Sequence, residues 1–346
     1  MGQMDIREAL GKLTAAHGTS GREYGAAACG AELLAPYGQV STDTLGNVLL
    51  AREGNAPEKA DHITLTAHLD EIGMMVREID DKGYLKIAAV GGLDRRGLMG
   101  QEVLVLADEP VYGVVCSVPP HLTSSDDRKK LLEMDDMAID IGYSKEEAEK
   151  HVSIGDWAVV LAPLVELQNG MVSGKALDDR AGCASLLWAL DKLKGASLDC
   201  NVTVVFAAME EIGSQGARTA HYAAGATHAI AVDVTFGFAH GDKPHCPKMG
   251  SGAAIGFAPI LNPKMSKALV EAAKRHDIPY TTEVMGGRTG TDADAIHTSG
   301  SGVVTGLLSI PERYMHSPVE VIDPEDVKAV GDLIAAYIID TWGTEN

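Results

Sequence analysis

Apolar residues recur at two different spacings in the first part of the chain. Residues 4–17 and 22–36 each carry an apolar position every three or four residues, which places those side chains on one face of a helix. Residues 47–51 and 62–67 are instead short runs of apolar and β-branched residues with little polar interruption, which is typical of buried strands. The N-terminal part therefore predicts two amphipathic helices followed by two strands.

After Gly174 the chain alternates between strand patterns and helix patterns. We expect strands at 202–208, 228–234 and 303–310, and helices at 179–194, 214–224, 262–277 and 323–340. The last helix begins with an N-cap, Asp323, and with Pro324 at its first position. Repeated strand–helix alternation predicts an α/β fold with a mostly parallel mixed sheet flanked by helices.

Residues 71–170 do not show this alternation of strand and helix patterns. Short strand-like pieces are separated by turn signals such as 80–83 and 119–120, and one charged helical stretch covers 144–150. The strand at 62–67 belongs with the later α/β pattern. We therefore expect one α/β domain, residues 1–70 plus 171–346, interrupted by a small β-rich domain over 71–170.

The charge balance excludes some partners. The 346 residues include 49 Asp plus Glu and 29 Lys plus Arg, which gives a formal net charge of −20. Such a chain repels phosphate backbones and anionic lipids, so we expect no nucleic-acid and no membrane partner. The five cysteines form no C-x-x-C pair, and the start resembles no secretion signal. These features predict a cytoplasmic protein whose acidic residues mostly form a solvated surface.

Metal-binding side chains follow the predicted strands. The strand at 62–67 runs into His68, 202–208 into Glu210 and Glu211, and 303–310 into a turn that leads to His316. Asp233 ends the apolar run 228–232, and Asp178 begins the helix at 179–194. Ligands of open α/β sheets bind beyond the carboxyl ends of the strands. These side chains therefore predict a metal centre with the ligands His68, Asp178, Glu211, Asp233 and His316.

The size of this set bears on the number of ions. One metal needs about four protein ligands, so the surplus favours two ions that share a carboxylate. Imidazole and carboxylate ligands without thiolate suit zinc, with cobalt or manganese as alternatives. Each piece also has an ordinary interpretation: His68-Leu69-Asp70 as a core hydrogen bond, Glu210-Glu211 as a solvated helix face, and Asp178-Asp179 as an N-cap. Their joint position favours the metal centre.

Two carboxylates remain for other roles. Residues i and i+2 of an extended segment face the same way, so Asp70 can accept a hydrogen bond from the second nitrogen of His68 and fix its ring. Neighbours such as Glu210 and Glu211 cannot both point at one ion. We therefore expect Glu210 to act as the general base.

Five segments together resemble the tetrahedral (TET) aminopeptidases, a family of cytosolic dinuclear metallopeptidases of which some are labelled cellulases or endoglucanases. They are TAHLDEIG (66–73), GKALDDRAG (174–182), EEIGSQGA (210–217), AVD (231–233) and RYMHSP (313–318). The resemblance implies that Asp178 bridges two ions, with His68 and Asp233 on one and Glu211 and His316 on the other. It also implies Glu210 as base, Asp70 behind His68, and a cis-type peptide bond after Asp178.

The resemblance further implies an activity: removal of N-terminal residues from peptides by a water molecule that two metal ions activate. It implies that 71–170 is a dimerisation domain, that dimers assemble into a dodecamer, and that His121 lies at an interface or pocket rim. Asp292 either takes part in the site or only caps a helix. The alternatives are another dinuclear hydrolase on this fold, such as a deacylase or carboxypeptidase, and a non-catalytic assembly protein. A glycosidase is disfavoured, since glycoside hydrolysis uses two carboxyl groups and no metal.

Overall fold

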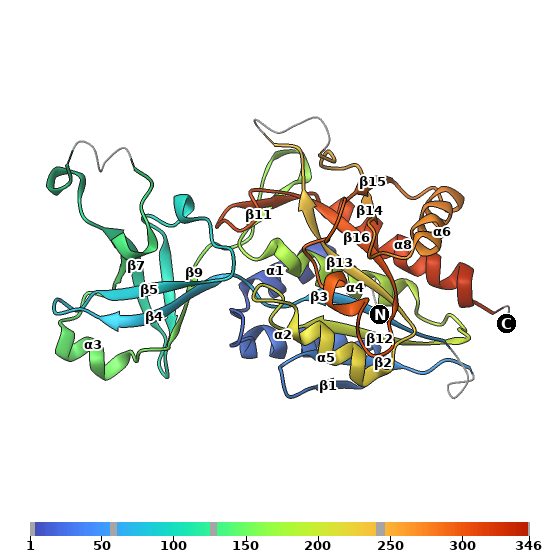
Figure 1. Ribbon diagram of the computed structural model, residues 1–346, viewed down its shortest axis with the longest axis horizontal. Coiled ribbons are helices and arrows are strands. Elements are labelled where there is room, and N and C mark those ends of the chain that lie inside the picture. Colours follow the sequence, from blue (N-terminus) through green and yellow to red (C-terminus); the bar gives the residue numbers. More distant parts are fainter. Residues whose placement is uncertain (1–3, 56–60, 125–129, 240–245, 345–346) are drawn as a thin grey trace.

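The protein is built on two separate β-sheets, a large mixed sheet covered by helices and a small closed barrel at its side (Figure 1). The computed structural model describes residues 4–55, 61–124, 130–239 and 246–344. All residues singled out in the sequence as candidate site residues fall within these ranges.

Four parallel strands form the centre of the large sheet. They are β12 (Cys200–Ala207), β3 (Asp61–His68), β13 (His228–Phe236) and β16 (Val304–Arg313), side by side in this order. Their residues are buried almost throughout, because helices cover both faces. These strands lie where the apolar runs predicted them. Their carboxyl ends lie at one edge, and this edge carries the site.

Antiparallel strands extend this parallel centre on both sides. β1 (Val40–Thr42) and β2 (Val48–Arg52) lie beyond β12, while β17 (Glu320–Ile322), β11 (Val172–Gly174) and β10 (Val165–Glu166) lie beyond β16. β14 (Ala253–Phe257) pairs with β16 and with β15 (Tyr280–Val284). The predicted α/β fold with a mixed sheet is thus confirmed, and the parallel pairing is concentrated at its centre.

Helices cover both faces of the large sheet. The helices α1 (Ile6–Ala15), α2 (Tyr24–Leu34), α4 (Leu177–Lys192), α6 (Pro263–Arg275) and α8 (Pro324–Trp342) share one hydrophobic core, and α5 (Gln215–Ala224) and α7 (Ala293–Ile296) share another. α4 packs against β3, β13, α1 and α8, so its first fourteen residues are all buried. Within the described part of the chain, no helix combines the length and the apolar content that a membrane crossing requires.

The barrel has its own hydrophobic core. Its strands are β4 (Gly73–Ile79), β5 (Leu85–Val90), β6 (Glu102–Leu106), β7 (Val111–Ser117), β8 (Met137–Asp140) and β9 (Trp157–Val160), and α3 (Lys145–His151) packs beside them. Ser144 caps α3, as its position before a charged helical stretch suggests. Alternate residues of these strands point inward, among them Met74, Ile87 and Val103. The chain enters the barrel directly after the site residues that follow β3.

Candidate metal centre

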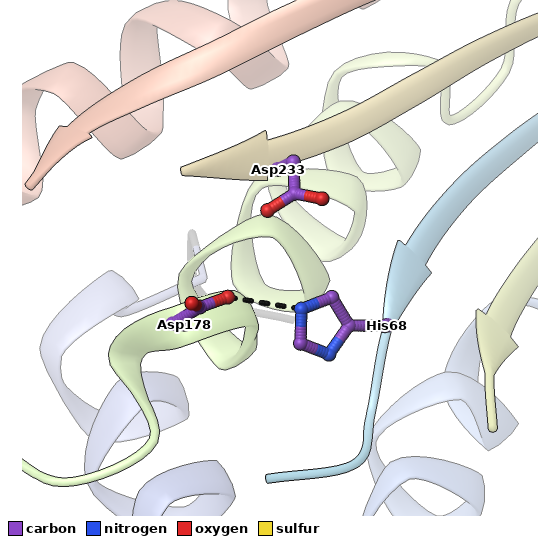
Figure 2. A group of neighbouring side chains, drawn as sticks. All are labelled: His68, Asp178 and Asp233. Atoms are coloured by element: carbon purple, nitrogen blue, oxygen red, sulfur yellow. Dashed lines mark hydrogen bonds and ion pairs between the residues drawn. The ribbon is translucent and has the colours of Figure 1, made fainter. Parts of the chain in front are cut away.

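His68, Asp178 and Asp233 form a first group of metal-binding side chains (Figure 2). His68 is the last residue of β3, Asp178 lies at the start of α4, and Asp233 projects from β13. One ligand atom from each lies within 4.8 Å of the others, and all three residues are buried. The Nε2 atom of His68 is 2.9 Å from Oδ1 of Asp178.

Asp178, Glu211 and His316 form a second group under the same 4.8 Å limit. The Nε2 atom of His316 is 3.1 Å from Oδ2 of Asp178 and 3.3 Å from Oε1 of Glu211. Asp178 therefore belongs to both groups and presents one oxygen to each imidazole. The peptide bond between Asp178 and Asp179 is cis, as the family resemblance implies.

Backbone carbonyls fix the orientation of both imidazole rings. Nδ1 of His68 is 3.1 Å from the carbonyl oxygen of Asp70, and Nδ1 of His316 is 2.8 Å from that of Gly92. A carbonyl oxygen can only accept a hydrogen bond, so Nδ1 donates in both rings. In a neutral ring the lone pair then lies on Nε2, the nitrogen that faces Asp178.

The Asp70 carboxylate lies behind His68 and joins three segments. Its Oδ1 is 3.5 Å from Nδ1 of His68 and accepts the backbone N–H of Glu210 at 2.9 Å. Its Oδ2 accepts the Ser20 hydroxyl at 2.5 Å and the backbone N–H of Glu211 at 3.2 Å. Asp70 is thus placed to orient His68, and it also fixes the backbone of the Glu210-Glu211 pair. Ser20 belongs to the segment 18–21, which separates the two helices predicted at 4–17 and 22–36.

Glu210 lies in the wall of the cavity beside the two metal-binding groups. The Ser214 hydroxyl is 3.3 Å from its Oε1. Burial, together with the negative charges of Asp292, Asp70 and Glu211, raises the pKa of Glu210 to about 8, although His68 opposes the rise. A carboxyl group with this pKa can take up and release a proton near neutral pH.

Asp292 is buried close to Glu210 and does not cap the helix that follows. It precedes α7, but its side chain makes no capping hydrogen bond. Burial raises its pKa to about 7, and the charge of Asp70 adds to the rise. The buried carboxyl therefore lies in the acidic environment of the site. His121 is exposed in the barrel and is not among the residues that line the cavity.

A buried ion-pair cluster joins the segments that carry His68 and Asp178. Nζ of Lys175 lies 2.6 Å from Oε2 of Glu71, and a guanidinium nitrogen of Arg180 lies 3.6 Å from Oε1. Arg180 also donates to the backbone carbonyls of Leu69, Leu13 and Ala16. The start of α4 is thereby held against the end of β3.

The charges of the site favour a bound cation. Burial alone would lower the pKa of His316, but its hydrogen bonds to Asp178 and Glu211 raise that pKa to about 11. Burial and mutual repulsion raise the pKa of Asp179 and Asp233 well above the ordinary value. Buried carboxylates at this density need positive charge to remain ionised. Two imidazoles and three carboxylates in two groups with a common member suit divalent ions such as zinc.

The two groups open into a cavity of about 1000 Å³. Apolar side chains line one part of it, among them Val234, Ile260, Met285 and Leu307. The arginines Arg218 and Arg288 and the carboxylate of Glu283 also reach its wall. A cavity of this size can hold a peptide end next to the metal-binding groups.

Comparison with known proteins agrees with this arrangement. Residues 46–333 match the family model described as M42 glutamyl aminopeptidase. The chain is 35% identical to the lysyl aminopeptidase of Pyrococcus furiosus over 84% of this chain and 83% of that protein.

Two solved structures extend the similarity over almost the whole chain. Aminopeptidase APDkam598 of the archaeon Desulfurococcus kamchatkensis has a TM-score of 0.90 and 35% identity, over 97% of this chain and 95% of its own. The TET1 peptidase of Pyrococcus horikoshii, which can assemble into a tetrahedron or a large octahedral shell, has a TM-score of 0.85 and 31% identity, over 96% and 99%. The chain belongs to the M42 aminopeptidase family and is a metal-dependent aminopeptidase.

Proposed function

We propose that this aminopeptidase uses two divalent metal ions per subunit. His68, Asp178 and Asp233 would hold one ion, and Asp178, Glu211 and His316 the other. The observation that carries the proposal is the shared Asp178, whose two oxygens face two different imidazole nitrogens at 2.9 and 3.1 Å. Bridging by a carboxylate is typical of two-metal hydrolases.

Zinc is the proposed ion, with cobalt and manganese as the alternatives that the same ligands accept. Bound ions of this kind polarise a substrate carbonyl and lower the pKa of water toward 7. Two divalent ions would also offset four units of the net charge of −20. The protein's contribution is to place five ligands at one edge of the sheet and to fix their orientation.

Glu210 is the proposed general base. Ser214 lies next to Oε1, and no described residue donates a hydrogen bond to Oε2, so Oε2 is available to the reacting groups. Glu210 would accept a proton from the attacking water at Oε2 and pass it to the nitrogen of the leaving amine. Asp70 supports this role because it holds the Glu210 backbone N–H at 2.9 Å.

The charge of the site supports removal of residues from the amino terminus. A free α-amino group is positively charged, and a carboxylate that lines the cavity outside both metal-binding groups, such as Glu283, would attract it. The adjoining cavity of about 1000 Å³ would receive the side chain of the first residue. A peptide bond in the middle of a chain offers no such positive group, so the enzyme would act as an exopeptidase on peptides.

We further propose that residues 1–70 plus 171–346 form the catalytic domain, and that 71–170 form a dimerisation domain. The separate core of the barrel supports this division, as do its exposed apolar side chains, among them Tyr112, Val118 and Leu122. The exposed His121 is a candidate for the interface. The dodecamer and the tetrahedral or octahedral assemblies named for TET1 support a homo-oligomer, which we propose to be built from dimers up to a dodecamer. The proposed cytoplasmic location rests on the sequence alone.

Metal titration of the metal-free protein tests this function. We expect no hydrolysis of aminoacyl anilides after treatment with a chelator, and activity that rises to a plateau at two zinc ions per subunit. The same anilides with an acetylated amino group serve as the control and should not be cleaved. Full activity at one ion, or equal cleavage of the acetylated substrates, would contradict the proposal. A panel of acidic, basic and apolar aminoacyl groups gives the preferred N-terminal residue.

A further inference from the structure

Glu320 is a buried carboxylate that touches two of the proposed ligand residues without belonging to either metal-binding group. It is the first residue of β17 and is 1% exposed. Its Oε2 accepts the backbone N–H of Leu177 at 2.7 Å and that of Asp178 at 3.3 Å. Its Oε1 accepts the backbone N–H of His316 at 3.1 Å. One side chain thus connects two segments that are 138 residues apart.

The backbone at both contacts is irregular and needs such a partner. Asp178 has a ψ of 107°, which is not helical although it lies at the start of α4. His316 has a φ of +62°, in the left-handed region that side chains with a Cβ rarely adopt. Regular helix or strand hydrogen bonds cannot satisfy N–H groups in such conformations, and buried N–H groups are almost always paired. Glu320 supplies the acceptors.

A second buried carboxylate, that of Asp70, holds backbone N–H groups of the site in the same way. Asp70 accepts the backbone N–H groups of Glu210 and Glu211, as described above. Two buried carboxylates therefore hold the backbone of three proposed ligands and of the proposed base. Asp70 was expected from its spacing to His68, whereas nothing in the sequence near Glu320 indicates its role.

We propose that Glu320 is a positioning residue that holds Asp178 and His316 in register and so builds the group Asp178–Glu211–His316. The inference rests on the ligand assignment of the proposed function. His316 depends on Glu320 more than Asp178 does, because Asp178 lies in a buried helix that packs on the sheet. His316 lies in a turn, where its ring is held by the carbonyl of Gly92 and its backbone N–H by Glu320.

The variant Glu320→Gln tests this role. A glutamine has the same shape but only one acceptor oxygen, and its NH2 group is a donor. The oxygen is expected to stay with Leu177 and Asp178, which provide two donors, so the NH2 group would face the N–H of His316. Residues that orient metal ligands typically change metal affinity about 10–100-fold when they are replaced. We therefore expect Glu320→Gln to weaken the second zinc ion by that factor and the first by much less.

Calorimetric zinc titration of the metal-free protein, with elemental analysis of the bound metal, gives the readout independently of activity. Asp326→Asn is the matched control, because Asp326 is also 1% exposed and its carboxylate also accepts two backbone N–H groups, those of Gly250 and Gly252, which belong to no proposed ligand. It should bind both ions like the wild type. If Glu320→Gln does not fold, Glu320→Asp replaces it, since its shorter side chain keeps the charge but cannot reach both segments.

Unchanged zinc affinities in the Glu320 variant would overturn the proposal, and so would an equal loss at both ions. The same loss in Asp326→Asn would also overturn it, because removal of any buried carboxylate that holds backbone N–H groups would then suffice. A wild-type protein that binds a single ion would instead contradict the two-ion centre of the proposed function. In that case the affinity for this one ion still decides, since an unchanged value in Glu320→Gln overturns the positioning role.

Discussion

Nε2 of His68 lies 2.9 Å from Oδ1 of Asp178. A neutral imidazole carries a single N–H hydrogen, and His68 donates it through Nδ1 to the carbonyl of Asp70. Nε2 and Oδ1 then both carry lone pairs, and two such atoms repel each other at hydrogen-bond distance. A cation between them removes the repulsion. In the metal-free protein a proton can fill this place, because hydrogen bonds to Asp178 and Asp70 raise the pKa of His68 against the effect of burial. In the loaded enzyme a metal ion would take its place.

Asp178→Asn is expected to lose both ions and all measurable activity. The amide keeps the size of the side chain but replaces one acceptor oxygen with a donor, so it cannot serve both groups. Elemental analysis of the purified variant measures the loss, and circular dichroism checks that the fold is retained. Two ions still bound in this variant would contradict the bridging role of Asp178.

Glu210→Gln should keep the fold and both ions while kcat falls about 10²–10⁴-fold, the range typical of a lost general base. Its neighbour provides the contrast: Glu211→Gln removes a ligand and should lose the second ion as well as activity. Aminoacyl anilide kinetics and metal analysis of the two variants separate the roles. Near wild-type turnover in Glu210→Gln would remove Glu210 as the base.

Lys175→Met is expected to destabilise the protein by about 3 kcal/mol, because the buried Glu71 then keeps only the backbone N–H of Gly18 at 3.0 Å and the Arg180 guanidinium at 3.6 Å. The exposed pair Lys145–Asp81 has a similar separation of 2.9 Å, so Lys145→Met is the control and should change the stability much less, because water screens this pair. Urea unfolding with a chelator present measures both changes without a contribution from metal binding. Equal effects of the two substitutions would show that the buried cluster adds no particular stability.

His221 makes the folded state sensitive to acid. Its ring is buried between Thr66 and the carbonyl of Ala217, and burial lowers its pKa from 6.5 to about 4. The unfolded chain therefore binds a proton below pH 6.5 that the folded chain refuses until about pH 4. As the pH falls from 6.5 to about 4, this residue should therefore lower the free energy of unfolding by roughly 3 kcal/mol.

The variant His221→Gln should lose this part of the pH dependence. The difference between wild type and variant in urea unfolding, followed from pH 7 to pH 4 with a chelator present, isolates the effect from other groups. His151→Gln, at an exposed position of the barrel, is the control for the substitution itself. Parallel curves for wild type and His221→Gln would contradict the prediction.

The central part of the fold could be predicted because each central strand is mostly apolar or β-branched. β3, β12, β13 and β16 are buried on both faces, so their sequences show little polar interruption. β15 was not expected: its sequence is Tyr-Thr-Thr-Glu-Val and none of it is fully buried. Strands at the margin of a sheet need fewer apolar residues, so their signal is weaker.

The candidate ligands could be predicted for a related reason. They follow strands, and parallel strands end at one edge, so their positions in the sequence imply that they lie close together. The side chains that orient them carry no such signal. Ser20 and Glu320 act on residues 50 and 142 positions away, and only the folded chain brings them together. Asp70 is the exception, because it is adjacent to His68 both in the sequence and in space.

The contact between His316 and Gly92 makes the site on the large sheet depend on the barrel. Gly92 follows β5 of the barrel, and its carbonyl orients an imidazole that the large sheet provides. The backbone N–H of Asp94 also donates to the carbonyl of His316. A shortened chain without the barrel would keep all five proposed ligands, yet the ring of His316 would lose its acceptor. The barrel is therefore part of the smallest unit in which this site is complete.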